Sequence, residues 1–459
     1  MASGNDIEKG LVNGSDSINA ERGGINVEQL KITLNTKILK ADSPLPSTCC
    51  IFRVPEVLRR QKVRAYEPDI VSIGPLHRGA DAKFKLVENV KEWYLKCLLW
   101  RMPSITLDRL IESMKELEIE ARGCYSDPCN DLDQNDFIEM LILDGCFLIE
   151  LFRKAPDESK QDDHDPIFNV SCMLEYLYHD LLLIENQLPW FVLECFYNLI
   201  ESDNHVPLST VVINFFRDSV ADPSIFSYRK SKSTIEILHI VDLIRTSLVQ
   251  EHVDEPEDPN AAAPTPKLTN GTNHLPQRIP SAATLTEAGV KFRKPKEPEA
   301  GSPGGCILNI TFKDGVFTIP PLAIDERTDP LFRNLMAYEQ CYHSCTHKIT
   351  SYAVLMDNLI DTAKDVDLLC EKGIVANWLS SEDASKFFND LYNDTTVIDF
   401  VYKGLCTKVN DYHNDRWNRW MEKARSDYFD TPWSIIAFAT AFVLLVLTFL
   451  QTVFTIHQP

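Results

Sequence analysis

The sequence lacks the short motifs by which the common enzyme classes are recognised. It contains no glycine-rich phosphate loop, no G-x-S-x-G nucleophile turn, no H-E-x-x-H zinc motif and no protein-kinase signature. Positive charge is also scarce, since 46 Lys and Arg stand against 67 Asp and Glu and the formal net charge is −21. Because nucleic-acid binding needs a basic face for phosphate, we expect no nucleic-acid partner.

An apolar run of the kind found in secretory signal peptides is missing from residues 1–25, which are polar and rich in Gly and Asn. The 13 cysteines are an odd number and show no spacing typical of a small disulfide-bonded domain. Both features predict a chain that stays in the cytosol with reduced thiols.

The C-terminal end differs, because residues 431–456 contain no charged side chain. As a helix, residues 433–456 would be about 36 Å long, enough for a bilayer core of about 30 Å. The sequence therefore predicts a transmembrane helix at 431–456 and a short tail at 457–459. Basic residues at 416–425 precede this segment and none follows it, which predicts a tail-anchored, single-pass protein of the plasma membrane with its large domain in the cytosol.

Composition divides the rest of the chain. Residues 1–48 are polar and Gly-rich, which predicts a disordered N-terminal tail. Residues 49–430 form the expected domain, interrupted by an acidic, proline-rich flexible insertion at 251–284 and a Pro- and Gly-rich loop at 295–305.

Apolar residues at helical spacing predict helices at 107–122, 137–152 and 173–184, and Asp329-Pro330 is typical of a helix start. One strand pair, at 306–312 and 316–319, is joined by a Lys-Asp-Gly hairpin turn. The expected fold class is mainly α: a multi-helix globular domain with a small β-hairpin element, plus the C-terminal transmembrane helix.

Several blocks resemble, in order, the plant domain-of-unknown-function 247 family. They are IFRVPEVLRR (51–60), YEPDIVSIGPLHRG (66–79), LDGCFLIELF (143–152), DLLLIENQLPWFVLE (180–194), LTEAGVKFRK (285–294), FTIPPLAID (317–325) and FRNLMAYEQC (332–341). The resemblance covers about residues 45–456 and departs from the family at Arg78, where the family has a second His. It implies a plant membrane protein without established catalytic activity. Some family members are associated with pollen–stigma recognition in grasses, which implies a recognition or signalling role.

Two carboxylates fall on apolar helix faces. Asp144 lies about 130° from the polar stripe of its helix, and Glu339 lies in the middle of the apolar face of the helix after Pro330, with His343 one turn later at the edge. A buried charge is costly unless it is paired. The expected partners are Arg53, Asn186 and Gln187.

Two interpretations of these residues stay open. In one, Glu339 and His343 form an acid–base pair supported by Asp144. In the other, all belong to a buried polar network that fixes helix register, which is the commoner role of buried charges. No catalytic residue is assigned, and the three remain weak candidates.

The string Cys341, His343, Cys345 and His347 has the residue types of a zinc site. On a single helix, however, the cysteines and histidines point to opposite sides, so the four cannot meet one ion unless the helix breaks. We therefore predict neither a metal nor a cofactor.

Two further polar features have structural and functional alternatives. Residues 185–187 (Glu-Asn-Gln) precede Pro189, which must end or kink a helix, and we expect them to satisfy the freed backbone groups; a ligand cleft is the alternative. The basic segments 53–64 and 291–296 are expected to be solvated surface, with anionic lipid as the alternative contact.

The leading prediction is a non-enzymatic, tail-anchored plant membrane protein whose helical domain binds a partner protein. An unrecognised membrane-associated enzyme with a buried Glu/His/Asp site is the alternative. A third possibility is an outward-facing recognition domain, which five Asn-x-Ser/Thr sequons permit and the flanking charges oppose. A closed core around Glu339, with exposed apolar side chains elsewhere, would favour the partner-binding protein. An open pocket around Glu339 would favour the enzyme.

Overall fold

The computed structural model describes residues 26–39, 45–79, 82–127, 129, 131–201, 206–217, 236–249, 277–295, 306–415 and 432–456. The predictions for most of the insertion and loop at 251–284 and 295–305, and for the tail at 457–459, lie outside the described residues. The chain divides into two compact units, Met1–Pro46 and Ser47–Pro459, and each is described by itself.

In the first unit the structure describes helix α1 (Val27–Leu39), within the segment predicted as a disordered tail. The side-chain oxygen of Asn26 accepts a hydrogen bond from the backbone N–H of Gln29 at 3.1 Å and so caps the helix. The side chains from Asn26 to Ile38 are exposed.

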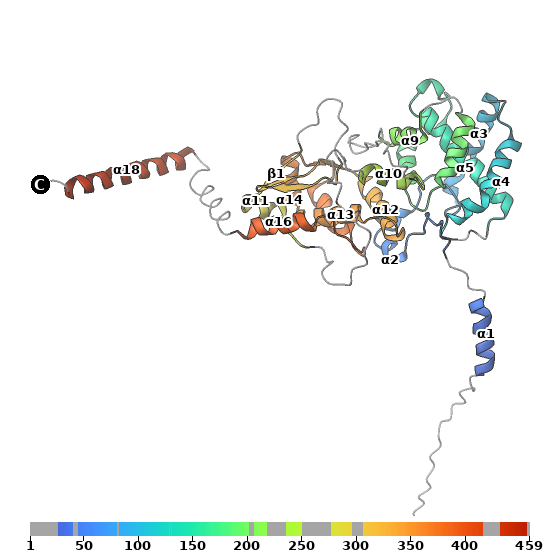
Figure 1. Ribbon diagram of the computed structural model, residues 1–459. Helices are drawn as coiled ribbons and strands as arrows, with labels where there is room; N and C mark the ends of the chain where they lie inside the picture. Colours follow the sequence, from blue (N-terminus) through green and yellow to red (C-terminus); the bar gives the residue numbers. More distant parts are fainter. Residues whose placement is uncertain are drawn as a thin grey trace, which may run out of the picture. The chain divides into compact units, whose positions relative to one another are not determined.

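The second unit is mainly helical (Figure 1). Its α-helices are α2 (Glu56–Arg59), α3 (Lys85–Arg101), α4 (Leu107–Gly123), α5 (Gln134–Lys154), α6 (Pro166–Asn169), α7 (Met173–Leu181), α8 (Trp190–Ile200), α9 (Leu208–Arg217), α10 (Ile240–Val249), α11 (Ala282–Glu287), α12 (Thr328–Cys341), α13 (Lys348–Leu359), α14 (Ala363–Glu371), α15 (Ser381–Leu391), α16 (Lys403–Asn414) and α18 (Pro432–Ile456). Short 3-10 helices are η1 (Val63–Tyr66), η2 (Ala82–Phe84) and η3 (Glu158–Lys160).

The predicted helices at 107–122 and 137–152 are confirmed as α4 and α5. Thr106 and Asp133 cap them by accepting hydrogen bonds from backbone N–H groups of the first turn. The third helix, α7, ends at Leu181, earlier than the predicted 184. Beyond this end the Gln187 amide donates hydrogen bonds to the carbonyls of Leu181 and Leu183, both at 2.8 Å.

The predicted antiparallel pairing is confirmed by β2 (Thr311–Lys313) and β3 (Val316–Thr318), but the first strand begins at Thr311 and not at the predicted residue 306. Asp314 and Gly315 both have positive φ, at 52° and 74°, as a tight hairpin turn requires. The sequence did not predict β1 (Lys291–Arg293), which adds parallel to β3 and gives the sheet order β1-β3-β2. A second small sheet joins β4 (Leu322–Ile324) and β5 (Val375–Asn377) in parallel.

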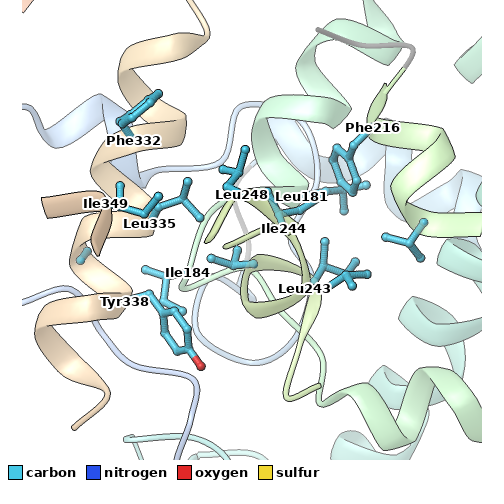
Figure 2. Packing of buried hydrophobic residues seen from close by; sticks show 14 of the residues in the cluster. Leu181, Ile184, Phe216, Leu243, Ile244, Leu248, Phe332, Leu335, Tyr338 and Ile349 are labelled. Atoms are coloured by element: carbon cyan, nitrogen blue, oxygen red, sulfur yellow. The ribbon is translucent and has the colours of Figure 1, made fainter. Parts of the chain in front are cut away.

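The core of the second unit runs through its centre along α5, α10 and α12, whose side chains are largely buried. Figure 2 shows α10 at the junction of α9 and α12: Leu243, Ile244 and Leu248 lie between Phe216 and Leu335. Helix α10 is thus surrounded by helices contributed by both earlier and later parts of the sequence.

The prediction of a transmembrane helix at 431–456 is wrong for this structure. A helix, α18, does form at Pro432–Ile456. Within the part of the chain that the structure describes, no helix has both the length and the apolar character needed to cross a membrane. The plasma-membrane location with a cytosolic domain depended on that helix and stays an untested prediction.

Candidate functional site

Buried polar side chains hold two irregular segments, 50–54 and 69–77, against the helices. Glu185 accepts a hydrogen bond from the N–H of Val54 at 2.6 Å, and Asp180 accepts three, from the N–H groups of residues 69–71, at 2.7, 2.8 and 2.9 Å. These segments belong to no described helix or ladder over most of their length, so their buried N–H groups need side-chain acceptors.

Asp144 of α5 is fully buried, as its place on the apolar helix face predicts. Its Oδ2 accepts the N–H of Gly74 at 2.8 Å, and its Oδ1 lies 2.7 Å from Nζ of Lys91, which is also fully buried. Burial raises the pKa of Asp144 above its ordinary value, although Lys91 acts in the opposite direction. The predicted partner Arg53 is elsewhere, in a surface ion pair with Asp127 at 3.0 Å.

Glu185 lies between two basic side chains at the edge of this network. Arg59 donates a hydrogen bond to its Oε1, and Nε2 of His77 lies 3.0 Å from its Oε2. Burial alone would raise the pKa of Glu185, but His77, the N–H of Val54 and Arg59 together outweigh burial and lower it. Glu185 is therefore a carboxylate held in its charged form.

Asn186 and Gln187 have the role that the sequence predicts for residues before Pro189. The amide of Asn186 donates to the carbonyls of Asp180 at 2.9 Å and Val71 at 3.1 Å, and its oxygen accepts the N–H of Ile73 at 2.6 Å. With the Gln187 bonds described above, both amides serve backbone groups freed where α7 ends.

Glu339 of α12 acts as a cap for the next helix, α13. Its two carboxylate oxygens accept hydrogen bonds from the N–H of Ile349 at 3.0 Å and from the N–H and hydroxyl of Thr350 at 2.9 and 2.8 Å. Arg245 of α10 donates to the same carboxylate at 3.0 Å. A carboxylate at a helix N-terminus satisfies orphan donors and interacts favourably with the helix dipole. Glu339 is fully buried.

His343 does not join Glu339. Helix α12 ends at Cys341, so the helical spacing that would place His343 one turn after Glu339 is not continued. His343 is exposed, and its Nε2 lies 3.2 Å from the hydroxyl of Ser344. Glu339, His343 and Asp144 thus lie in three separate environments, and a catalytic role for them stays an untested prediction.

The four side chains of the Cys/His string also do not converge. His347 is buried with Nδ1 3.0 Å from the carbonyl of Thr396, whereas His343 faces solvent. In the part of the chain that the structure describes, one group of potential ligands lies together: atoms of Asp69, His179 and Asp180, all within 4.8 Å. Both oxygens of Asp180 already accept backbone N–H bonds, so this carboxylate has a structural role.

A cavity of about 120 Å³ opens between α5, α8 and α9, with Arg153, Lys160, Tyr197 and Glu201 among its lining residues. Ligand pockets usually measure about 300–1,000 Å³, so this one is too small for a drug-sized molecule. None of the three candidate residues lines it.

Two basic members of the network were missed in the sequence. Lys91 sits on the apolar stripe of α3, in line with the buried Val87 and Tyr94, and this misplaced charge is a signal that sequence reasoning can use. Arg245 occupies a similar place on α10 and is also buried.

Comparison with known proteins agrees with the resemblance described above. The family model DUF247, described as "Plant protein of unknown function", matches residues 51–447. An Arabidopsis thaliana protein named "UPF0481 protein At3g47200" is 28% identical over 432 residues, which cover 90% of this chain and 88% of that protein. Another, "Putative UPF0481 protein At3g02645", is 25% identical over 493 residues, with 88% and 89% covered. No solved structure matches. Because the match covers most of its length, the chain belongs to the plant family of unknown function DUF247.

Proposed function

We propose that this chain is a non-catalytic recognition module that binds a partner protein, with a rigid helical core and a separate contact helix, α1. The observation that carries the proposal is the apolar stripe of α1. Val27, Leu30, Leu34 and Ile38 are 69%, 49%, 47% and 68% exposed, while Ile32, on another side of the helix, is 60% exposed. Large apolar side chains gathered on one solvent-facing stripe are typical of interaction surfaces.

The spacing of these four residues places them on one face of the helix at 100° per residue. An amphipathic helix that lies in the apolar groove of another protein presents its anchors in this way. Lys31 and Lys37 lie on either side of the stripe, so the complementary groove has carboxylates at its rim.

The buried acids support the same proposal. Glu339, Asp144, Glu185 and Asp180 each bind backbone N–H groups that have no helix or sheet partner of their own. Their chemistry is used to hold the core closed, and a closed core with exposed apolar side chains elsewhere favours a binder. A recognition or signalling role also agrees with the family resemblance.

Proximity labelling in plant cells tests this proposal with the full chain. Leu30→Asp with Leu34→Asp breaks the stripe, while Gln29→Asp with Thr36→Asp adds the same charge to the opposite face. We expect the first variant to lose proteins that the wild type and the control variant both label. A wild type that labels no protein above an unrelated tagged chain would refute the proposed function, and equal labelling by all three would show that α1 is not the contact helix.

A further inference from the structure

The two faces of the small sheet β1-β3-β2 differ in chemistry. Phe292, Phe317 and Phe312 stand opposite one another in register and point to one face. Phe292 and Phe317 stack with ring centroids 5.5 Å apart, and Phe312 contacts the ring of Tyr412 from α16 at 5.7 Å. This face is therefore the core side of the sheet.

The other face is basic and open to solvent. Because successive side chains of a strand alternate between faces, Lys291 and Arg293 on β1 and Lys313 on β2 all point away from the phenylalanines. All three are exposed. Val316 on the central strand pairs with Lys291 on one side and with Lys313 on the other. The two charges therefore lie in one row across the sheet.

These cations differ from those of the other basic segment, 53–64. There, four basic side chains are paired: Arg53 with Asp127, Arg59 with Glu185, Arg60 with Asp394 and Lys62 with Asp329. Among the described residues, no carboxylate lies within ion-pair distance of the three cations on the sheet. In a chain of net charge −21, a row of unpaired cations on a sheet favours an anionic partner.

Strand β1 also has a free edge in the described sheet. It pairs with β3 alone, through bonds such as Lys291 N–H to the Gly315 carbonyl at 2.9 Å and Ile319 N–H to the Arg293 carbonyl at 3.0 Å. In a parallel ladder the intervening residue, Phe292, directs its N–H and carbonyl to the opposite side. A free edge of this kind can accept a further strand.

We propose that Lys291 and Arg293, with the free edge of β1, form a basic sheet surface that binds an extended acidic segment of a partner protein, and that Lys313 on the far strand β2 adds to the positive potential of the same face. The segment adds as a strand beside β1, and acidic side chains at every second position face the cations, which are also two residues apart. The inference rests on the proposed function and names a second contact of the same module. An anionic lipid surface would use the charges but not the strand edge, so the peptide is the occupant that the geometry favours.

Fluorescence anisotropy with the full chain tests this inference. The probe is a labelled peptide of alternating Glu and Val, compared with a peptide of alternating Gln and Val. We expect the acidic peptide alone to bind and its affinity to fall between about 0.1 M and about 0.5 M salt. Lys291→Glu with Arg293→Glu should weaken binding about tenfold or more, because two attractive contacts become repulsive.

The matched control is Arg109→Glu with Lys115→Glu, which makes the same charge change on exposed residues of α4. Equal weakening by this control, or equal binding of the Gln peptide, would overturn the inference. The inference would also be overturned if the Glu peptide does not bind, while the wild type binds phosphatidylserine vesicles and Lys291→Glu with Arg293→Glu abolishes that binding. If proximity labelling still finds the same partners with Lys291→Glu and Arg293→Glu and the peptide does not bind, this inference fails while the proposed function stands.

Discussion

Nζ of Lys91 lies 2.7 Å from Oδ1 of Asp144, and neither side chain reaches solvent. The pair joins α3 to α5 beneath the irregular segment 69–77, because Lys91 also donates to the carbonyl of Ser72 at 2.5 Å and Asp144 accepts the N–H of Gly74. A buried charge pair costs desolvation of both ions, and the loss of one partner leaves the other charge uncompensated.

Asp144→Asn should therefore lower the free energy of unfolding by about 1–3 kcal/mol, since Lys91 keeps its buried charge with only Glu88, at 2.6 Å, as counter-charge. Glu139→Gln is the control, because Glu139 is exposed on the same helix and should change stability by less than about 0.5 kcal/mol. Urea denaturation followed by circular dichroism measures both. Similar midpoints for the two variants would show that the pair does not stabilise the fold.

Glu339→Gln distinguishes the structural from the catalytic interpretation. An amide in place of the carboxylate leaves Arg245 without its counter-charge. The amide also turns an N–H donor toward the N–H groups at the N-terminus of α13. We therefore expect the free energy of unfolding to fall by about 3 kcal/mol. His343→Gln should be nearly neutral, because His343 is exposed. Thermal unfolding measures both variants. Unchanged stability of Glu339→Gln together with loss of a biochemical activity would favour the enzyme.

Gly145→Ala should destabilise the protein although alanine is the better helix former. A Cβ at Gly145 in α5 would overlap the ring of Phe196 from α8, and relieving this overlap costs about 1–3 kcal/mol against a gain of about 1 kcal/mol in helix propensity. Gly404→Ala in α16 is the control, because its Cβ meets no atom within 4 Å. Denaturant unfolding should show opposite signs for the two variants; a stabilised Gly145→Ala would contradict the close contact of α5 with α8.

His239 makes stability depend on pH. Burial lowers the pKa of His239 from 6.5 to about 3, and its ring nitrogens lie 3.2 Å from the carbonyl of Cys50 and from the N–H of Asp242. The unfolded chain gains a proton below its ordinary pKa and the folded chain does not. Neutral His239 therefore lowers the stability of the folded chain only below pH 6.5. The free energy of unfolding declines as the pH falls from 6.5 toward 3.

Between about pH 7 and about pH 5 the wild type should lose about 2 kcal/mol more stability than His239→Gln, which does not titrate. Unfolding by urea at several pH values measures the difference between the two chains, in which other titrating groups largely cancel. His343→Gln should keep the wild-type pH dependence. A His239→Gln variant with the wild-type pH dependence would show that folding does not lower the pKa of His239.

The sequence predicted the helices and the hairpin where the signals are local. Thr106 and Asp133 are capping residues before apolar periodic segments, and Asp314-Gly315 is a turn dipeptide, so α4, α5 and the β2–β3 pair could be predicted. Strand β1 could not, because three residues form a strand only when β3 lies beside them. The uncharged run at 431–456 predicted a helix correctly and a membrane span incorrectly.

By itself the sequence determined that Asp144 and Glu339 are buried, because the periodicity of the neighbouring residues places both on apolar helix faces. Only the tertiary structure decided the partners of these two acids. Asp144 pairs with Lys91, and Glu339 binds Arg245 and the N-terminus of α13. Partner choice depends on which distant segments come to lie side by side, and no local periodicity carries that information.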